Sequence, residues 1–127
     1  MRSRMTIREV LVVDDERHIV TLLTELLEAE GYRVRQANDG IAALREIDQR
    51  RPDLVLTDDM MPRLGGLELA RRMVALNIPT IVMSAAIVQA RDPSLVFLPK
   101  PLNVDDLIRV VGTLLASAHG RSGTPRS

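Results

Sequence analysis

Cysteine is absent from the 127 residues of this chain. Its absence excludes disulfides, thiolate metal sites and a cysteine nucleophile, and it is typical of a reducing compartment. Aromatic residues are nearly absent as well, and Tyr32 and Phe97 are the only two in the sequence. The chain therefore has few side chains that could stack against nucleic acid bases. Seventeen basic and seventeen acidic residues give a formal net charge of zero, so no overall field attracts polyanions or anionic lipid. We therefore expect neither direct nucleic acid binding nor membrane binding.

Long apolar runs are also missing. No run approaches the roughly 18–20 residues of a membrane-spanning helix, and residues 1–9 lack the apolar region of a signal peptide. We therefore expect a cytoplasmic protein. Its length and its 46% hydrophobic content suit one compact domain with a core. We predict a flexible N-terminus over residues 1–7, a domain over 8–118 and a disordered, polar tail over 119–127.

Short apolar runs alternate with stretches of helical period along the chain. Five runs are typical of strands, and they cover residues 10–13, 32–37, 54–57, 80–83 and 95–98. The second run has interleaved charges, which predicts an edge strand. Between the first two runs, five apolar residues repeat with the helical period and predict one buried helix face: Ile19, Leu22, Leu23, Leu26 and Leu27. Repeated strand–helix units predict an α/β fold with a doubly wound parallel sheet.

Polar residues follow these strands at the edge of the sheet where ligands bind in such folds. The candidates are Asp14, Asp15, Asp58, Ser84 and Lys100. Three carboxylates brought together repel one another unless a cation neutralises them, and Mg²⁺ prefers oxygen ligands of this kind. A lysine and a serine could bind a phosphate, while a carboxylate can act as the nucleophile that forms an aspartyl phosphate. This set predicts Mg²⁺-dependent phosphoryl chemistry.

Several motifs in the same order resemble the receiver domains of two-component response regulators. They are Asp14-Asp15-Glu16, the segment from Pro52 to Pro62, Gly66, Ser84-Ala85 and Lys100-Pro101. The most specific are the acidic pair, the Asp-x-x-Met-Pro segment and the Lys-Pro pair, and the resemblance covers about residues 8–118. It implies a flavodoxin-like, five-stranded parallel sheet in the order 2-1-3-4-5.

The resemblance also implies a function. Asp58 would accept a phosphoryl group from a sensor histidine kinase or a phosphotransfer protein, and the domain would then switch conformation. The switch would act on a downstream protein or an output domain. The only chemistry catalysed would be the chain's own phosphorylation and dephosphorylation, so we do not expect an enzyme with turnover.

Individual roles follow from the resemblance as well. Asp14, Asp15, Asp58 and the backbone carbonyl of Met60 would hold Mg²⁺. Lys100 would pair with the phosphoryl group, and its peptide bond to Pro101 would be cis. Ser84 and Phe97 would be the switch residues, although Phe97 has plain packing as an equally good interpretation. Asp59 is expected to point away from the site into solvent, because neighbouring side chains alternate faces near a strand end.

The sequence departs from the family pattern between Ser84 and Lys100, which lie only 16 positions apart. The missing length falls on the fourth helix, which we predict to be shortened or missing, with an altered output face. Met60 and Ala86 offer no polar group to orient water, which predicts a phosphoryl group that is not short-lived.

Two other functions remain open at the level of sequence. One is a phosphorylation-independent interaction module that keeps the fold. The other is a Mg²⁺-dependent hydrolase with Asp58 as nucleophile, although the sequence has neither a second carboxylate in an Asp-x-Asp arrangement nor an insertion that could form a substrate cap.

Overall fold

The computed structural model describes residues 6–85 and 95–123, with side chains up to residue 117. This part of the chain forms five strands and four helices. The strands are β1 (Glu9–Val13), β2 (Arg33–Ala37), β3 (Leu54–Asp58), β4 (Thr80–Ser84) and β5 (Val96–Pro99). All neighbouring strands are parallel, in the order β2-β1-β3-β4-β5. The predicted sheet and its strand order are confirmed.

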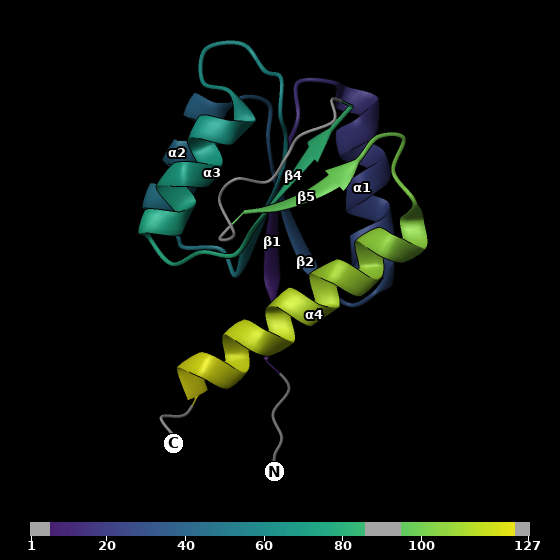
Figure 1. Cartoon of the computed structure of the whole chain (residues 1–127), viewed down its shortest axis with the longest axis vertical. Coiled ribbons are helices and arrows are strands. Elements are labelled where there is room, and N and C mark those ends of the chain that lie inside the picture. Colours follow the sequence, from purple (N-terminus) through teal and green to yellow (C-terminus); the bar gives the residue numbers. More distant parts are fainter. Residues whose placement is uncertain (1–5, 86–94, 124–127) are drawn as a thin grey trace.

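Helices cover both faces of the sheet, as Figure 1 shows. They are α1 (Arg17–Ala29), α2 (Gly40–Gln49), α3 (Gly66–Ala75) and α4 (Val104–Gly123). In the view of Figure 1, α2 and α3 lie on one side of the strands and α1 on the other, while α4 starts on the side of α1 and runs diagonally below the sheet. The core residues of α1 and α4 belong to one layer. The sheet is therefore doubly wound.

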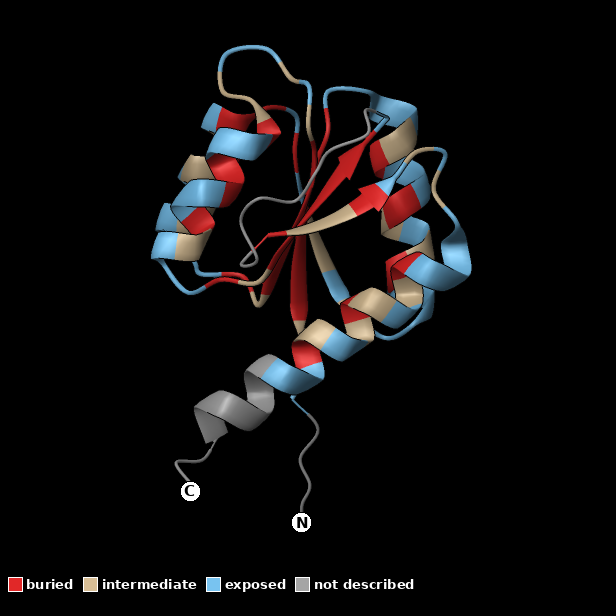
Figure 2. Cartoon of the chain, in the orientation of Figure 1, coloured by how far each residue is buried: buried red, intermediate tan, exposed pale blue. Residues whose placement is uncertain are grey.

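The core consists mainly of two hydrophobic layers that share the central strands. Along β1, Val10 and Val12 belong to the layer beneath α1 and α4, whereas Leu11 and Val13 belong to the layer beneath α2 and α3. Successive side chains of a strand point to opposite faces, so a continuous apolar run can fill both layers. Figure 2 shows the buried central strands between the helices.

Strand β2 lies at one edge of the sheet, as its interleaved charges predicted, and four of its five residues are only half-buried or exposed. Strand β5 forms the other edge and ends at Pro99. A proline lacks a backbone donor, which an edge position tolerates.

Helix ends agree with the local chemistry of the sequence. Gly31 follows α1 with a φ of 98°, a left-handed conformation that glycine adopts without strain. The Asp39 side chain accepts a hydrogen bond from the Ala42 N–H (2.7 Å) and begins α2. Asn103 accepts one from the Asp106 N–H (2.9 Å) before α4. These contacts satisfy backbone donors that helix starts leave free.

The segment predicted to carry a shortened or missing fourth helix, residues 86–94, lies outside the described residues. Helix α4 continues to Gly123, so the boundary predicted at residue 118 falls within a helix. Leu22 was predicted to be buried in α1 but is 51% exposed, because the buried face of that helix centres on Val20, Leu23 and Leu27. No helix in the described part of the chain is long and apolar enough to cross a membrane.

Candidate functional site

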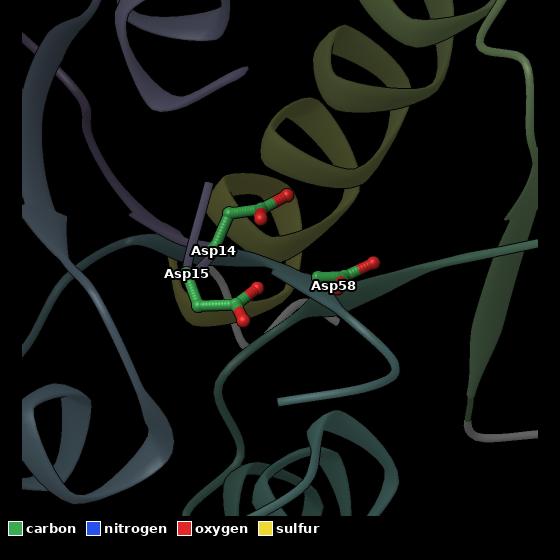
Figure 3. Close-up of side chains that lie close together, drawn as sticks. All are labelled: Asp14, Asp15 and Asp58. Atoms are coloured by element: carbon green, nitrogen blue, oxygen red, sulfur yellow. The ribbon is translucent and has the colours of Figure 1, made fainter. Parts of the chain in front are cut away.

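Three carboxylates meet where two neighbouring strands end. Asp14 follows β1 and Asp58 ends β3, and the pairing of Val13 with Thr57 brings the two strand ends side by side. Asp14, Asp15 and Asp58 each place a carboxylate oxygen within 4.8 Å of the other two. Figure 3 shows the three side chains grouped at this edge. The structure thus brings together the acidic residues that the sequence singled out.

Burial makes this cluster electrostatically unusual. Asp14 is 1% exposed and Asp58 is 5% exposed, while Asp15 is exposed. The pKa of Asp14 is raised to about 6: burial is the main cause and the charge of Asp58 adds to it, whereas the Glu16 N–H, which donates to Asp14 Oδ1 (2.9 Å), opposes it. The clustered charges therefore favour an added cation.

The donor set fits a hard divalent cation such as Mg²⁺. Asp14 Oδ2 is buried and has no hydrogen-bond partner among the described residues. A buried polar atom without a partner is unfavourable, and a metal ion would satisfy it. Carboxylate oxygens are the ligands that Mg²⁺ prefers. Asp14, Asp15 and Asp58 are therefore suitable metal ligands by chemistry and by position.

Lys100 reaches this cluster from the edge strand. Its backbone N–H donates to the carbonyl of Ser84 (2.9 Å), which fixes it beside the end of β4, and its Nζ donates to Asp58 Oδ1. The peptide bond between Lys100 and Pro101 is cis. A fixed ammonium group beside a carboxylate is well placed to bind an anion attached to that carboxylate.

The Asp58–Lys100 pair titrates under opposing influences. Burial raises the pKa of Asp58 and the nearby charge of Asp59 adds to this, whereas the bond to Lys100 lowers it; the pKa remains above its ordinary value. For Lys100, burial lowers the pKa, but the hydrogen bond and charge of Asp58 outweigh it and raise the pKa overall. Lys100 is therefore positively charged at neutral pH.

Ser84 ends β4 and is buried at 2% exposure. Its hydroxyl donates to Asp59 Oδ2 (2.7 Å). The prediction that Asp59 points away into solvent is therefore wrong: its side chain is half-buried and contacts the last residue of the neighbouring strand. The pairing of two strands explains the difference, since the Asp59 N–H still donates to the carbonyl of Met83 (3.0 Å) and so holds the residue beside β4.

Two other predicted site residues have distinct surroundings. Phe97 is half-buried and packs against a small cluster of Ala70, Val82 and Leu95. The Met60 side chain is 76% exposed. Phe97 therefore has a packing role, while the switch role of Phe97 and the metal role of the Met60 carbonyl stay predictions.

Sequence reasoning missed how closely the backbone packs beside Asp58. The loop after β3 returns so tightly that a Cβ on Gly66 would lie 1.8 Å from the Asp58 carbonyl oxygen. Gly66 entered the sequence analysis only as one of the motifs that carry the family resemblance. Its position at the start of α3, at the end of the short loop that follows Asp58 and Asp59, was the available signal.

Sequence reasoning also missed an ion pair between two loops. Arg63, in the loop after β3, binds the buried carboxylate of Asp39 at the start of α2. The two residues are 24 positions apart, and nothing in their local sequences signals the contact.

An open pocket of about 410 Å³ lies beside the acidic cluster. It reaches Asp14 and Asp15 but is lined neither by Asp58 nor by Lys100. Its other lining residues come from α1, the end of β2 and the start of α2: Arg17, Val20, Gln36, Ala37, Asn38 and Ala42. The pocket gives solvent access to the carboxylates from the β2 side of the sheet.

Relatives with known sequences share most of this chain. It is 36% identical over 107 residues to sporulation initiation phosphotransferase F of Bacillus subtilis, which covers 78% of this chain and 86% of that protein. It is 36% identical over 124 residues to the DNA-binding transcriptional regulator NtrC of Bradyrhizobium, covering 91% of this chain and 26% of NtrC. The chain spans a quarter to a half of the length of NtrC, PhoP of Bacillus subtilis and MprA of Mycobacterium leprae.

Solved structures show the same fold. The Francisella response regulator 1452 receiver domain matches with a TM-score of 0.78 at 30% identity, over 87% of this chain and 98% of that one. The chemotaxis protein CheY4 of Vibrio cholerae matches with a TM-score of 0.76 at 26% identity, over 86% and 99%. The family model described as "Response regulator receiver domain" matches residues 10–112. Sequence and fold agree over nearly all of the sheet, and the chain belongs to the response regulator receiver domain family.

Proposed function

We propose that this receiver domain is a Mg²⁺-dependent phosphoacceptor switch whose phosphorylated residue is Asp58. Membership of the family makes it a signalling module of two-component systems. The observation that carries the finer proposal is the Asp58 carboxylate, grouped with Asp14 and Asp15 and contacted by Lys100. A nucleophile, metal ligands and a fixed cation are the parts that phosphoryl transfer needs.

In the proposed reaction, a carboxylate oxygen of Asp58 attacks the phosphorus of a phosphohistidine. The new O–P bond forms as the P–N bond breaks, and the leaving imidazole takes up a proton. Asp14, Asp15, Asp58 and the Met60 carbonyl would hold Mg²⁺, which when bound neutralises negative charge on the phosphoryl oxygens. Lys100, already held beside Asp58, would move its hydrogen bond to a phosphoryl oxygen.

The switch would follow from the new anion. A phosphoryl group carries more negative charge and more acceptor oxygens than a carboxylate. Ser84 would move toward it and donate its hydroxyl, and Phe97, already packed beside β4, would turn inward behind it. Two conformations separated by a few kcal/mol suffice for such a shift.

We propose a sensor histidine kinase or a phosphotransfer protein as the donor, and a downstream protein or an output domain as the target. One relative is named as a phosphotransferase, which supports the first part. NtrC is named as a DNA-binding transcriptional regulator, which supports an output in that protein beyond the region matched here. Catalysis by this chain would be limited to its own phosphorylation and dephosphorylation.

Intact mass after incubation with acetyl phosphate tests the proposal. We expect one phosphoryl group to be gained with Mg²⁺ and none when Mg²⁺ is chelated. Asp58→Asn should gain none, whereas Asp48→Asn, an exposed aspartate of α2, should behave as the unmodified sequence. No gain under any condition would contradict the proposal and favour a phosphorylation-independent interaction module.

A further inference from the structure

Asp59 is held from two sides by its own backbone. Its N–H donates to the carbonyl of Met83 in β4, and its carbonyl accepts from the N–H of Gly66 at the start of α3 (both 3.0 Å). These contacts do not depend on the side chain. The sheet and α3 therefore set the direction in which the Asp59 side chain leaves the backbone, and rotation within the side chain places its carboxylate.

The Asp59 carboxylate accepts a hydrogen bond from the Ser84 hydroxyl. The Ser84 Oγ to Asp59 Oδ2 distance is 2.7 Å, and Ser84 is buried. A hydrogen bond to a charged acceptor is about twice as strong as one between neutral groups. Meanwhile Lys100 is bonded to Asp58. The cation and the hydroxyl thus contact two adjacent carboxylates, and Ser84 donates to the one that is not the proposed phosphoacceptor.

We propose that Asp59 is a positioning residue that holds the Ser84 hydroxyl in the unphosphorylated arrangement and so opposes the switch. This inference rests on the proposed function, because it needs an anion on Asp58 that competes for Ser84. For Ser84 to bond a phosphoryl oxygen, its bond to Asp59 must break. The stronger that bond is, the weaker the net gain from the new one.

Asp59 also acts through charge alone. A phosphoryl group on Asp58 places new negative charge next to the Asp59 carboxylate, and like charges at this separation repel. This second effect does not need Ser84. The two effects can therefore be separated by removing the charge and the acceptor in different variants.

Beryllofluoride with Mg²⁺ serves as a phosphoryl mimic for the test, and its dissociation constant is measured by calorimetry. Asp59→Asn removes the charge but keeps an acceptor oxygen, whereas Asp59→Leu removes both at similar volume. We expect Asp59→Leu to tighten binding at least about tenfold, because it removes one charge-assisted hydrogen bond and the charge repulsion together, and Asp59→Asn to tighten it by less, because it keeps an acceptor for Ser84. In the Ser84→Ala background, the two substitutions should tighten binding equally, because only the charge effect remains.

Rescue provides the second readout. Ser84→Thr keeps a hydroxyl, so the difference between Asp59→Leu and Asp59→Asn should return in that background. If the role of Asp59 were purely structural, its substitutions would change the dissociation constant for beryllofluoride by the same factor whichever residue stands at position 84. Thermal unfolding of each variant shows whether it is folded. If the dissociation constants of Asp59→Leu and Asp59→Asn differ by the same factor with and without the Ser84 hydroxyl, the inference is wrong.

The failure of the inference is distinguishable from the failure of the proposed function. Binding of beryllofluoride by the unmodified chain, without coupling between positions 59 and 84, overturns the positioning role alone. No Mg²⁺-dependent binding by the unmodified chain overturns the phosphoacceptor function, and the inference with it.

Discussion

Gly66 allows the chain to turn from the acidic edge into α3 while touching the backbone of Asp58. A Cβ at this position would lie 1.8 Å from the Asp58 carbonyl oxygen and 2.8 Å from its carbonyl carbon. Neither atom can move without moving the end of β3. A single missing side chain therefore determines where the proposed phosphoacceptor lies.

We predict that Gly66→Ala lowers the free energy of unfolding by about 1–3 kcal/mol, the range for adding atoms to a site that is already filled. It should also slow phosphorylation by acetyl phosphate, because Asp58 must shift. Gly112→Ala is the control, since its nearest neighbour would be the Tyr32 hydroxyl at 3.9 Å. Urea unfolding should show no loss for Gly112→Ala; equal losses for both would contradict the prediction.

Glu9 is a nearly buried carboxylate that binds two arginines, and its surroundings predict how stability depends on pH. It lies at the other end of β1, with 9% of its side chain exposed, and binds Arg50 (2.7 Å) and Arg35 (3.3 Å). The hydrogen bond to Arg50 lowers the pKa of Glu9 below 4.5; burial opposes this, and the charge of Arg35 adds to it. A lowered carboxyl pKa stabilises the fold above the ordinary pKa, and the effect is lost as the pH falls through the folded-state pKa.

We expect Glu9→Gln to lower the free energy of unfolding at pH 7 by about 1–3 kcal/mol, through the loss of charge-assisted hydrogen bonds. Below pH 4.5 the difference in the free energy of unfolding between Glu9→Gln and the unmodified chain should shrink, since Glu9 itself then loses its charge. Urea unfolding from pH 7 to pH 3.5 measures this, with Glu28→Gln on the exposed side of α1 as control. A gap that stays constant with pH would show that the charge is not responsible.

At the scale of elements, Asp39 connects α2 to the loop that follows the proposed site. It caps α2 through the Ala42 N–H (2.7 Å) and binds Arg63 of the β3–α3 loop. The Ala42 hydrogen bond and then the Arg63 bond lower its pKa. Arg63 has a φ of 71°, which is unusual for a residue with a side chain, and its ion pair ties this conformation to α2. The Asp39 carboxylate thus caps one helix and holds a loop from a different part of the chain.

We predict that Asp39→Ala lowers the free energy of unfolding by about 1–2 kcal/mol, the effect of losing an N-cap. Asp39→Asn keeps a capping oxygen and should retain most of that stability. Arg63→Gln removes only the ion pair and should resemble Asp39→Asn in thermal unfolding. If Asp39→Asn is as unstable as Asp39→Ala, the ion pair rather than the cap is the main contribution.

At the scale of the whole molecule, the acidic cluster joins the ends of two central strands, so whatever neutralises it stabilises the fold. Asp14 and Asp58 are both buried, with 1% and 5% of their surface exposed. Their mutual repulsion opposes folding, and a ligand that binds only the folded state shifts the equilibrium toward it.

We predict that Mg²⁺ raises the melting temperature by several degrees, since a ligand at about 100 times its dissociation constant adds about 2.7 kcal/mol. Asp14→Asn should be more stable than the parent without Mg²⁺, because it removes buried charge, and should respond little to Mg²⁺. Asp48→Asn should keep the full response. An unchanged response in Asp14→Asn would remove Asp14 from the proposed metal ligands.

The sequence by itself determined the order of the strands and helices and the edge of the sheet at which the chemistry lies. Both follow from local patterns. Apolar runs such as residues 10–13 specify buried strands, and the acidic pairs come directly after them. Parallel strands share one carboxyl edge, so Asp14 and Asp58 had to meet once the strands paired.

Only the tertiary structure decided which partner each polar group takes. The alternation of side chains predicted Asp59 in solvent, yet the pairing of its N–H with Met83 turned it toward Ser84. The period of α1 predicted Leu22 as buried, but the face that the helix buries is turned toward Val20, which lies outside the predicted stripe. Contacts between residues far apart in sequence, such as Arg63 with Asp39, depend on how loops pack, and local sequence carries no signal for them.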